Sequence, residues 1–327
     1  MAHARFDATR RSLVAAAALA CVGPRALAQA WPSKPIRLVL GYAPGGGADV
    51  TAREFAQPLS RLLGQPIVVD YKAGAGGTLA AAEVARAAPD GYTLGLLDNA
   101  PLAIAPALRH VGYDPVKSFT PIAMVTQLPQ VLVANPGLPA SRSRELIALM
   151  RKQPGKLNYG SGGSGSVSHL AGELYKARSD TFALHVPYRG GAPAITALIA
   201  GEVQFAFLTY AATGSFIKSG QLKALGVASA ARMPQLPDVP TIAEDGLPGY
   251  EAQGWFALAG PAGMPPAIVQ TLQKALVEVL ASPAVVQRVE SMGQTVAAGK
   301  VDPDKAIATE LATWRKLVAE RKLSIEL

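Results

Sequence analysis

The chain has 327 residues, of which 50% are hydrophobic, and it carries a formal net charge of +8 at pH 7. A chain of this length can bury an ample hydrophobic core without disulfide cross-links and is expected to form about two domains. The basic residues are scattered and form no stripe interleaved with aromatic residues, so the positive charge gives little support to nucleic-acid binding.

The N-terminus predicts a secretory signal peptide over residues 1–30. An arginine pair precedes an apolar run at 13–23, which is too short to span a bilayer, and small residues then allow cleavage near Ala28 or Ala30. The arginine pair leaves the general secretory route and the twin-arginine route both open. The only cysteine, Cys21, lies in this segment, so no disulfide or cysteine nucleophile is expected in the mature protein. We therefore expect a periplasmic protein with no stable membrane insertion.

From residue 36 onward, short apolar strand-like runs alternate with segments of helical period. The predicted strands cover residues 36–40, 66–70, 92–97, 121–125, 131–135, 182–186, 203–208 and 223–228. Apolar stripes between them, such as Phe55, Leu59 and Leu62, predict amphipathic helices. From Pro265 onward the pattern predicts helices alone. Such alternation is typical of βαβ units and predicts an α/β fold with mostly parallel, helix-flanked sheets.

The mature chain contains no long linker or low-complexity tract. Two lobes without a linker are expected to be joined by strands that cross between them, so that each lobe is built from discontinuous segments. We predict one lobe from residues 31–131 and 231–327, and a second lobe from residues 132–230.

Glycine-rich turns lie at three predicted strand-to-helix junctions, at residues 41–49, 72–78 and 159–166. They could be plain loops whose glycines adopt positive φ angles. In parallel sheets, however, such junctions lie at the carboxyl ends of strands, where ligands bind. Backbone N–H groups and the helix dipole favour a small anion there, most simply a carboxylate.

Signatures of nucleotide binding and catalysis are weak by comparison. The third turn matches G-x-G-x-x-G, but Asp180 precedes the next predicted strand instead of ending it, as dinucleotide binding would require. A phosphate-loop motif and a G-x-S-x-G nucleophile motif are both absent from the sequence. The histidines of the mature chain lack the spacing of metal ligands. We therefore expect no cofactor, no metal and no catalytic residues.

Polar side chains near the third turn are candidate ligand contacts. A helix that begins near Gly165 places Ser166 and His169 on one face, opposite its apolar stripe. His169 is interpreted either as a ligand contact or as a surface histidine beside Glu173.

Two further charged residues have alternative interpretations. A fourth strand-to-helix loop, at 185–194, carries Tyr188 and Arg189. Arg189 could fork onto a carboxylate or remain a solvated loop charge. In the first turn, Asp49 is interpreted as a residue that favours the helix start, since it would repel an anion. Its alternative role is to accept a ligand amine.

Ordered sequence blocks between about Pro32 and Trp314 resemble the Bug receptors, the TctC-like solute-binding proteins of tripartite tricarboxylate transporters. These blocks are WPSKPIRLVLGYAPGGGAD (31–49), KAGAGGTLAAAEVARAAPDGYTL (72–94), YDPVKSFTPIAMV (113–125), QPGKLNYGSGGSGSVSHLAGEL (153–174), HVPYRGGAPAITALIAGEVQ (185–204) and GQLKALGVASAARMPQLPDVPTIAEDGLPGYEAQGWFALAGPAG (220–263). The resemblance implies a two-lobed, type II-like Venus flytrap fold with hinge strands between the lobes.

The resemblance also implies that backbone groups and ordered waters hold the ligand carboxylate. The matching loops run from Tyr42 to Asp49, from Ser161 to His169 and from Tyr188 to Ala192. The candidate ligand-binding residues are Tyr42, Ala43, Gly45, Gly46, Gly47, Asp49, Ser161, Ser164, Gly165, Ser166, His169, Tyr188, Arg189, Gly190 and Ala192. Tyr42 stands where many relatives have phenylalanine. Asp98 and Asn99 lie in a block that is less typical of the family and are candidates for altered selectivity.

The expected function is that of an extracytoplasmic receptor. It would enclose a small carboxylate, such as a dicarboxylate, a tricarboxylate, an amino acid or an aromatic acid, and deliver it to membrane subunits of the TctA/TctB type. The protein is expected to act as a monomer, without nucleic acid. The alternative is a periplasmic sensor component that presents the same kind of solute to a signalling partner.

Overall fold

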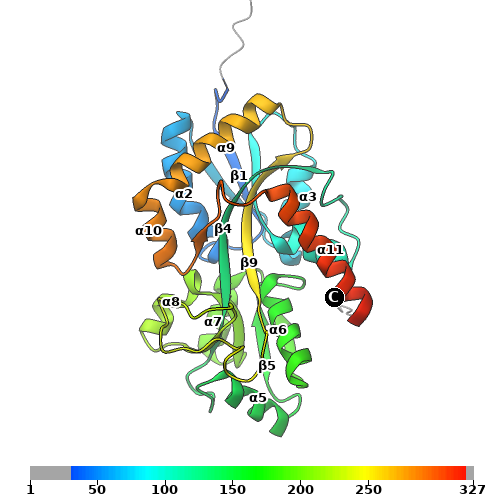
Figure 1. The fold of residues 1–327 in the computed structure, drawn as a ribbon, viewed down its shortest axis with the longest axis vertical. Helices are drawn as coiled ribbons and strands as arrows, with labels where there is room; N and C mark the ends of the chain where they lie inside the picture. The colour runs from blue at the N-terminus through cyan, green and yellow to red at the C-terminus, as the bar shows by residue number, and fades with distance from the viewer. Residues whose placement is uncertain (1–30, 322–327) are drawn as a thin grey trace, which may run out of the picture. The chain divides into compact units, whose positions relative to one another are not determined.

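Strand pairing organises the described part of the chain, residues 31–321, and the signal peptide predicted at 1–30 lies outside it. In this computed structural model the strands are β1 (Ile36–Leu40), β2 (Ile67–Tyr71), β3 (Thr93–Asp98), β4 (Phe119–Ala134), β5 (Asn158–Ser161), β6 (Leu184–Pro187), β7 (Phe205–Thr209), β8 (Lys223–Val227), β9 (Gln253–Pro261) and β10 (Thr295–Val296). Their hydrogen-bonded order is β2-β1-β3-β9-β4-β7-β5-β6, and β8 and β10 each pair with β4 (Figure 1).

The pairing defines two regions of strands. The β1 region consists of β1, β2, β3, β9, β10 and residues 119–129 of β4. The β5 region consists of β5, β6, β7, β8 and residues 130–134 of β4. The outer pairs are parallel, as predicted: β1 pairs with β2 and with β3, and β5 pairs with β6 and with β7. Every pair that involves β4 or β9 is antiparallel, so the strand directions are mixed.

Strand β4 crosses between the two regions, as expected for lobes joined without a linker, but it merges two predicted strands. The runs predicted at 121–125 and 131–135 are parts of one strand of 16 residues. Its first part pairs with β9, up to Pro129 opposite Gln253, and its last five residues pair with β7 and β8. The polar residues and the proline at 126–130 suggest a break, but the strand changes neighbours there and continues. Hydrogen bonds therefore run from one region to the other through a single strand.

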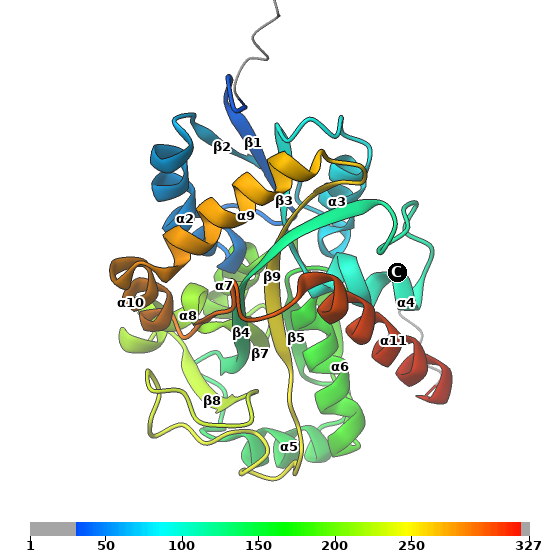
Figure 2. The ribbon, with the colours of Figure 1, turned by 45° about the horizontal axis from the view of Figure 1, so that its top comes forward.

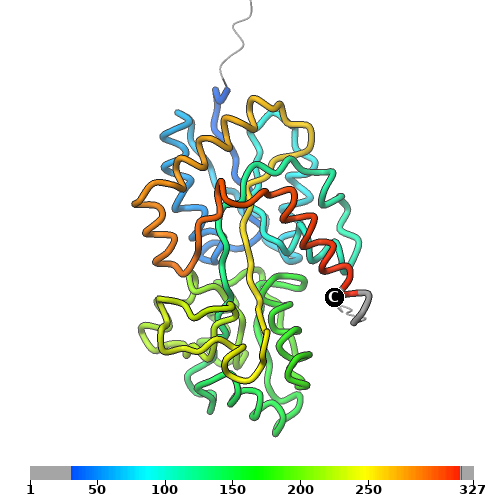
Figure 3. Tube along the Cα trace, viewed as in Figure 1, coloured from blue at the N-terminus to red at the C-terminus, as the bar shows by residue number. Residues whose placement is uncertain are grey.

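The chain returns between the regions beside β4. Gln130 donates its backbone N–H to Ala252 over 3.2 Å and accepts a hydrogen bond of 2.8 Å from the N–H of Ala228. Ala252 donates in turn to the carbonyl of Ala228 over 2.8 Å. Figure 3 shows the chain passing along β4 and coming back through the segment that leads into β9. These three residues mark the place where the backbone segments cross from region to region.

The helices in the described residues are α2 (Gly47–Leu63), α3 (Thr78–Ala85), α4 (Ala105–Leu108), α5 (Ser143–Lys152), α6 (Val167–Ser179), α7 (Gly191–Ala200), α8 (Tyr210–Lys218), α9 (Pro266–Ala281), α10 (Pro283–Ser291) and α11 (Pro303–Arg321), with short 3-10 and π turns at Ala75–Gly77 and Ala100–Ile104. Helices α2, α9 and α10 pack against one another, and α11 packs against the segment 100–108 (Figure 2). The C-terminal part is not helical alone, because β10 pairs with β4. None of the described helices is both long and apolar enough to cross a membrane.

Hydrophobic clusters lie on both faces of the strands. In β7, Phe205 and Phe207 pack in a cluster with Tyr159 and Tyr250, whereas the alternate residues Ala206 and Leu208 pack in another cluster. This is the two-residue period of a strand that is buried on both faces. Because Tyr250 belongs to the first of these clusters, chain beyond residue 230 packs with the β5 region. The β1 region has its own cluster, which joins segments as distant in sequence as Val39 and Ile307.

Candidate functional site

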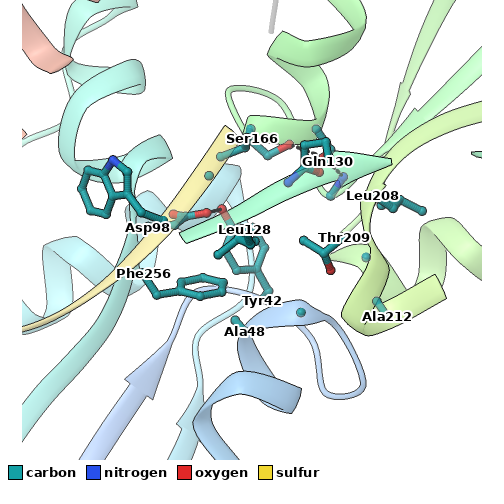
Figure 4. Close-up of a pocket in the computed structure, with 17 residues that line it drawn as sticks. Tyr42, Ala48, Asp98, Leu128, Gln130, Ser166, Leu208, Thr209, Ala212 and Phe256 are labelled. Carbon is teal, nitrogen blue, oxygen red and sulfur yellow. Dashed lines mark hydrogen bonds between the residues drawn. The ribbon is translucent and has the colours of Figure 1, made fainter. Parts of the chain in front are cut away.

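A cavity of about 70 Å³ is lined by residues of both regions (Figure 4). This volume accommodates a few waters or a compact small molecule. The lining residues are Tyr42, Gly47, Ala48, Asp98, Leu128, Gln130, Gly162, Ser166, Val167, Ser168, Gly191, Leu208, Thr209, Ala212, Gly254, Trp255 and Phe256. They come from the strands β3, β4, β7 and β9, from turns that follow strands and from the first turns of helices, which places the cavity where the two regions face each other.

Four of the described helices begin at this cavity. Gly47 and Ala48 open α2, Ser166 caps α6, Gly191 opens α7 and Thr209 caps α8. The first N–H groups of a helix have no partner within it, and the helix dipole makes this end partly positive. Among the described residues that line the cavity, none is Lys, Arg or His. An anion in this place would therefore be held by backbone N–H groups and neutral polar side chains.

The glycine turns of the two regions touch each other beside the cavity. Ala43 donates its backbone N–H to the carbonyl of Arg189 over 3.1 Å. A Cβ atom added to Gly190 would lie 2.9 Å from the nitrogen of Ala43, and one added to Gly76 would lie 2.6 Å from the carbonyl oxygen of Ser164. Because contacts this short leave no room for a side chain, glycine is required for the turns to approach so closely.

Asp98 is a buried carboxyl group in the cavity wall. The hydroxyl of Tyr42 donates a hydrogen bond of 2.6 Å to its Oδ2, whereas its Oδ1 is buried and has no hydrogen-bond partner among the described residues. Burial raises the pKa of Asp98 to about 7, although the bond from Tyr42 acts in the opposite direction. Burial, followed by the charge of Asp98, raises the pKa of Tyr42 well above its usual value, so Tyr42 remains a neutral donor.

Three of the predicted ligand-binding residues line the cavity, namely Tyr42, Gly47 and Ser166. The others do not: Ala43, Gly45, Gly46, Asp49, Ser161, Ser164, Gly165, His169, Tyr188, Arg189, Gly190 and Ala192. Many of these lie in the same turns as lining residues, immediately behind them. The sequence pattern therefore identifies the turns beside the cavity more closely than it identifies the positions within them.

Asp49 stabilises the first turn. Its Oδ2 accepts a hydrogen bond of 2.8 Å from the N–H of Gly45, and its Oδ1 accepts bonds from Tyr71 (2.7 Å) and Arg53 (3.0 Å). Burial raises the pKa of Asp49, but the hydrogen bonds from Tyr71, Gly45 and Arg53 together outweigh burial and lower it. Both oxygens are thus occupied within the protein, as expected for the role at the helix start rather than for a contact to a ligand amine.

His169 is neither a surface residue nor a lining residue, although α6 begins at Val167, close to the expected start near Gly165. Its side chain is buried, its Nδ1 accepts a hydrogen bond of 3.0 Å from the N–H of Gly165, and its ring stacks on His185 at 3.8 Å between centroids. His185 in turn lies 2.6 Å from the hydroxyl of Ser161. Burial, followed by the charge of Lys176, lowers the pKa of His169 to about 4. The histidine pair therefore supports the third glycine turn from behind as neutral rings.

The side chain of Arg189 is exposed, and only its carbonyl group takes part in the contact between the turns. Several lining residues are not among the predicted contacts, and Gln130 and Thr209 are two polar examples. Gln130 is a buried polar residue of β4, and Thr209 ends β7 at its carboxyl end. A buried polar side chain and the strand-end rule are the signals that could have identified them.

Comparisons with known proteins agree with this architecture. Residues 51–323 match the family model of the tripartite tricarboxylate transporter family receptor, TctC. The chain is 37% identical to BugT of Bordetella pertussis over 90% of this chain and 91% of that protein. The structure of the periplasmic binding protein BugD superposes with a TM-score of 0.87 and 33% identity, covering 90% of this chain and 100% of BugD. MatC from Rhodopseudomonas palustris with bound malate gives a TM-score of 0.84 and 33% identity, covering 88% of this chain and 100% of MatC.

These matches confirm the resemblance and the predicted class of fold, the two-lobed α/β binding protein. They also fix the broad class of activity, since the family consists of periplasmic solute-binding receptors and is not a class of enzymes. The chain belongs to the TctC family of tripartite tricarboxylate transporter receptors.

Proposed function

We propose that the protein captures a small carboxylate in the periplasm and delivers it to transporter subunits of the TctA/TctB type. The observation that carries this proposal is the convergence of four helix N-termini on a cavity whose described lining has no cationic side chain. This arrangement favours a compact anion that accepts several hydrogen bonds at once. The malate bound to MatC is an anion of this kind.

The ligand carboxylate would sit among the starts of α2, α6 and α7. Backbone N–H groups at Gly47, Val167 and Gly191 are the proposed donors, and the hydroxyls of Ser166 and Thr209 would add to them. A hydrogen bond to a charged group contributes roughly 1.5–3 kcal/mol. Removal of single donors should weaken binding by measurable amounts.

The domain division follows from the same proposal. The proposed lobes keep the predicted division except at its borders: residues 130–252 would form one lobe, because Leu247 and Tyr250 pack with the β5 region, and the residues on either side would form the other, with a hinge at the crossing marked by Gln130, Ala228 and Ala252. Closure about this hinge would bring the turns of the two lobes into the contact made by Ala43 and Arg189. The described conformation corresponds to the closed state.

The binding part of the proposal is tested by a thermal-shift screen of the protein purified from the periplasm after export. The panel contains monocarboxylates, dicarboxylates, tricarboxylates, amino acids and aromatic acids. A ligand at 100 times its dissociation constant stabilises the folded state by about 2.7 kcal/mol, which shifts the melting temperature by a few degrees. A panel in which no carboxylate raises the melting temperature would contradict the proposal.

The delivery part is tested in cells. Uptake of the radiolabelled ligand should require both this protein and the membrane subunits, and deletion of either should abolish it. Retained uptake in the absence of this protein, together with loss of a ligand-dependent transcriptional response, would favour a sensor over a transport receptor.

A further inference from the structure

The carboxyl group of Asp98 is not explained by binding of a simple anion. It lines the cavity in which the ligand would lie, its residue is only 7% exposed, and an ionised carboxylate there would repel a ligand carboxylate. No Lys, Arg or His among the described lining residues compensates this charge. Figure 4 shows the carboxyl group turned toward Tyr42 at the side of the cavity.

The hydrogen bonds of Asp98 leave one oxygen available. Tyr42 occupies Oδ2, and the backbone N–H groups of Asp98 and Ala100 lie close enough to the carboxyl group to lower its pKa, but Oδ1 is buried without a hydrogen bond of normal geometry in residues 31–321. A buried acceptor that lacks a hydrogen bond is costly, and such groups in native proteins call for an explanation. A donor carried by the ligand itself would satisfy it.

The neighbouring charges do not supply such a donor. Glu310 of α11 acts on Asp98 as a like charge, and it is itself bonded by Asn99 (2.7 Å) and by the indole N–H of Trp255. Tyr113 interacts with Asp98 only through space, because its hydroxyl donates to the carbonyl of Pro101 over 2.7 Å. Asp98 therefore faces the cavity with no cationic partner among these groups.

We infer that Asp98 is a specificity-determining residue whose Oδ1 accepts a hydrogen bond from the ligand, so that the preferred ligands are carboxylates which also carry an ammonium or hydroxyl group. This inference rests on the proposed function and narrows its substrate class. The helix N-termini would bind the carboxylate, and Asp98 would bind the donor. A plain dicarboxylate has no hydrogen-bond donor at neutral pH. It would leave Oδ1 of Asp98 unpaired, and an ionised Asp98 would repel it.

Ammonium and hydroxyl ligands differ in their expected pH dependence. An ammonium group favours ionised Asp98, so its binding would release a proton below pH 7 and its affinity would rise with pH up to about 7. A hydroxyl group can donate to either form, so its affinity should depend weakly on pH. A plain dicarboxylate would require the protonated form and would bind less tightly as the pH rises.

Titration calorimetry with succinate, malate and aspartate tests the inference, because these acids share a four-carbon skeleton and differ only in the substituent at C2. Matched sets with five carbons and with an aromatic ring extend the comparison. In at least one set, we expect the ammonium or hydroxyl acid to bind at least tenfold more tightly than the plain acid. Asp98→Asn should abolish this preference, and with an ammonium ligand it should also abolish the rise of affinity with pH. Asp90→Asn, at an exposed position, should leave the preference and the pH dependence unchanged.

The outcomes separate this inference from the proposed function. If the plain acid of every set binds as tightly as its substituted relatives, or if Asp98→Asn leaves the ratio of affinities unchanged, the inference is overturned while the carboxylate receptor stands. If no acid of any set binds, the receptor function fails, and the inference fails with it. Circular dichroism of Asp98→Asn shows whether the variant is folded. If it is not, the affinity ratios and the pH dependence of the wild-type protein still decide between the two outcomes.

Discussion

The backbone N–H of Ala43 donates a hydrogen bond of 3.1 Å to the carbonyl oxygen of Arg189. Ala43 belongs to the turn that follows β1, and Arg189 to the loop that precedes α7. The bond therefore joins the β1 region to the β5 region directly, next to the starts of two helices that line the cavity. It can exist only while these two turns are in contact, so opening about the proposed hinge would break it.

A side chain at Gly190 should oppose this closure. Its φ of +133° is unfavourable for other residues, and a Cβ atom would lie 2.9 Å from the nitrogen of Ala43. We expect Gly190→Ala to lower ligand affinity by about tenfold or more, which corresponds to roughly 1.4 kcal/mol. Small-angle scattering with saturating ligand should show less compaction than for the wild-type protein.

Gly220→Ala provides the control for Gly190→Ala. Gly220 also has a positive φ, of +73°, but no atom lies within 4 Å of the position that a Cβ atom would take. This variant carries backbone strain without a clash and should bind and close normally. Equal losses of ligand affinity in both variants would show that backbone strain alone causes the loss, and not the contact between the turns.

A β-branched side chain at Gly47 should fill the cavity. A Cβ atom there would lie 2.6 Å from Oγ1 of Thr209, another lining residue. We expect Gly47→Val to weaken carboxylate binding by about tenfold to a hundredfold, because the loss of a hydrogen bond to a charged group costs roughly 1.5–3 kcal/mol. The fold should survive, since Phe55 and Leu59, the buried residues of α2, are untouched.

Gly46→Ala is the matched comparison for Gly47→Val. The nearest atoms to a Cβ at Gly46 are 3.5 Å away, and its φ of −82° suits any residue. In this turn only Gly45 has a positive φ, so neither Gly46 nor Gly47 requires glycine for its backbone conformation. Calorimetry should therefore show near-normal affinity for Gly46→Ala. Normal affinity for a folded Gly47→Val would mean that the triple glycine is only a turn.

Much of the fold could be predicted from the sequence because it depends on local patterns. The alternation of strands and helices identifies β1, β2 and β3 to within one residue at each end. Strand β9 is missed although its run from Trp255 to Ala259 is apolar, and β5 is hidden within a glycine-rich stretch. Strand β4 is divided in two because Pro129 resembles a break, and only the neighbours on each side show why the strand continues.

The site was predictable only at the level of turns. Backbone donors at strand-to-helix junctions follow from local sequence, but which residues of a turn face the cavity depends on the contact between two distant turns. His169 illustrates this limit, since its burial is caused by Tyr159 and His185, which are brought to it by the sheet. The open carboxyl oxygen of Asp98 likewise emerges only when Tyr42 and Asp98 are seen together.

The raised pKa of Asp98 predicts a specific dependence of stability on pH. Its pKa is about 7 in the folded protein and about 3.9 in an unfolded chain, so between these values the folded state retains a proton that the unfolded state has lost. The stability contributed by Asp98 should therefore fall as the pH rises from about 4 to about 7, by up to about 4 kcal/mol. Urea unfolding of the wild-type protein relative to Asp98→Asn measures this difference.

Tyr42→Phe extends the test of Asp98. It removes the hydrogen bond that lowers the pKa of Asp98, so the fall in stability should continue to higher pH than in the wild-type protein. A stability difference between the wild-type protein and Asp98→Asn that stays constant from pH 4 to pH 7 would show that Asp98 does not retain its proton when folded.

The histidine pair predicts the opposite dependence. The pKa of His169 is about 4 in the folded protein, below its value of about 6.5 in an unfolded chain, so the unfolded state binds more protons between these values. Stability should therefore be lost through His169 as the pH falls below 6.5, at about 1.4 kcal/mol per pH unit at most. His169→Asn, whose amide oxygen can accept the hydrogen bond from Gly165, should remove this part of the loss, while His185, whose pKa is lowered by burial to about 3, keeps its own part. If the variant and the wild-type protein unfold identically in acid, the lowered pKa of His169 does not contribute to the loss of stability.

The central claim is that a carboxylate is held by the N-termini of helices at the contact between the β1 and β5 regions. A crystal structure of the protein with a carboxylate that raises its melting temperature tests this most directly. The account predicts the carboxylate oxygens about 2.7–3.2 Å from backbone nitrogens at the starts of α2, α6 or α7, within reach of Ser166 or Thr209. A carboxylate bound outside this cavity, or held by a Lys or Arg side chain instead of these backbone groups, would contradict it.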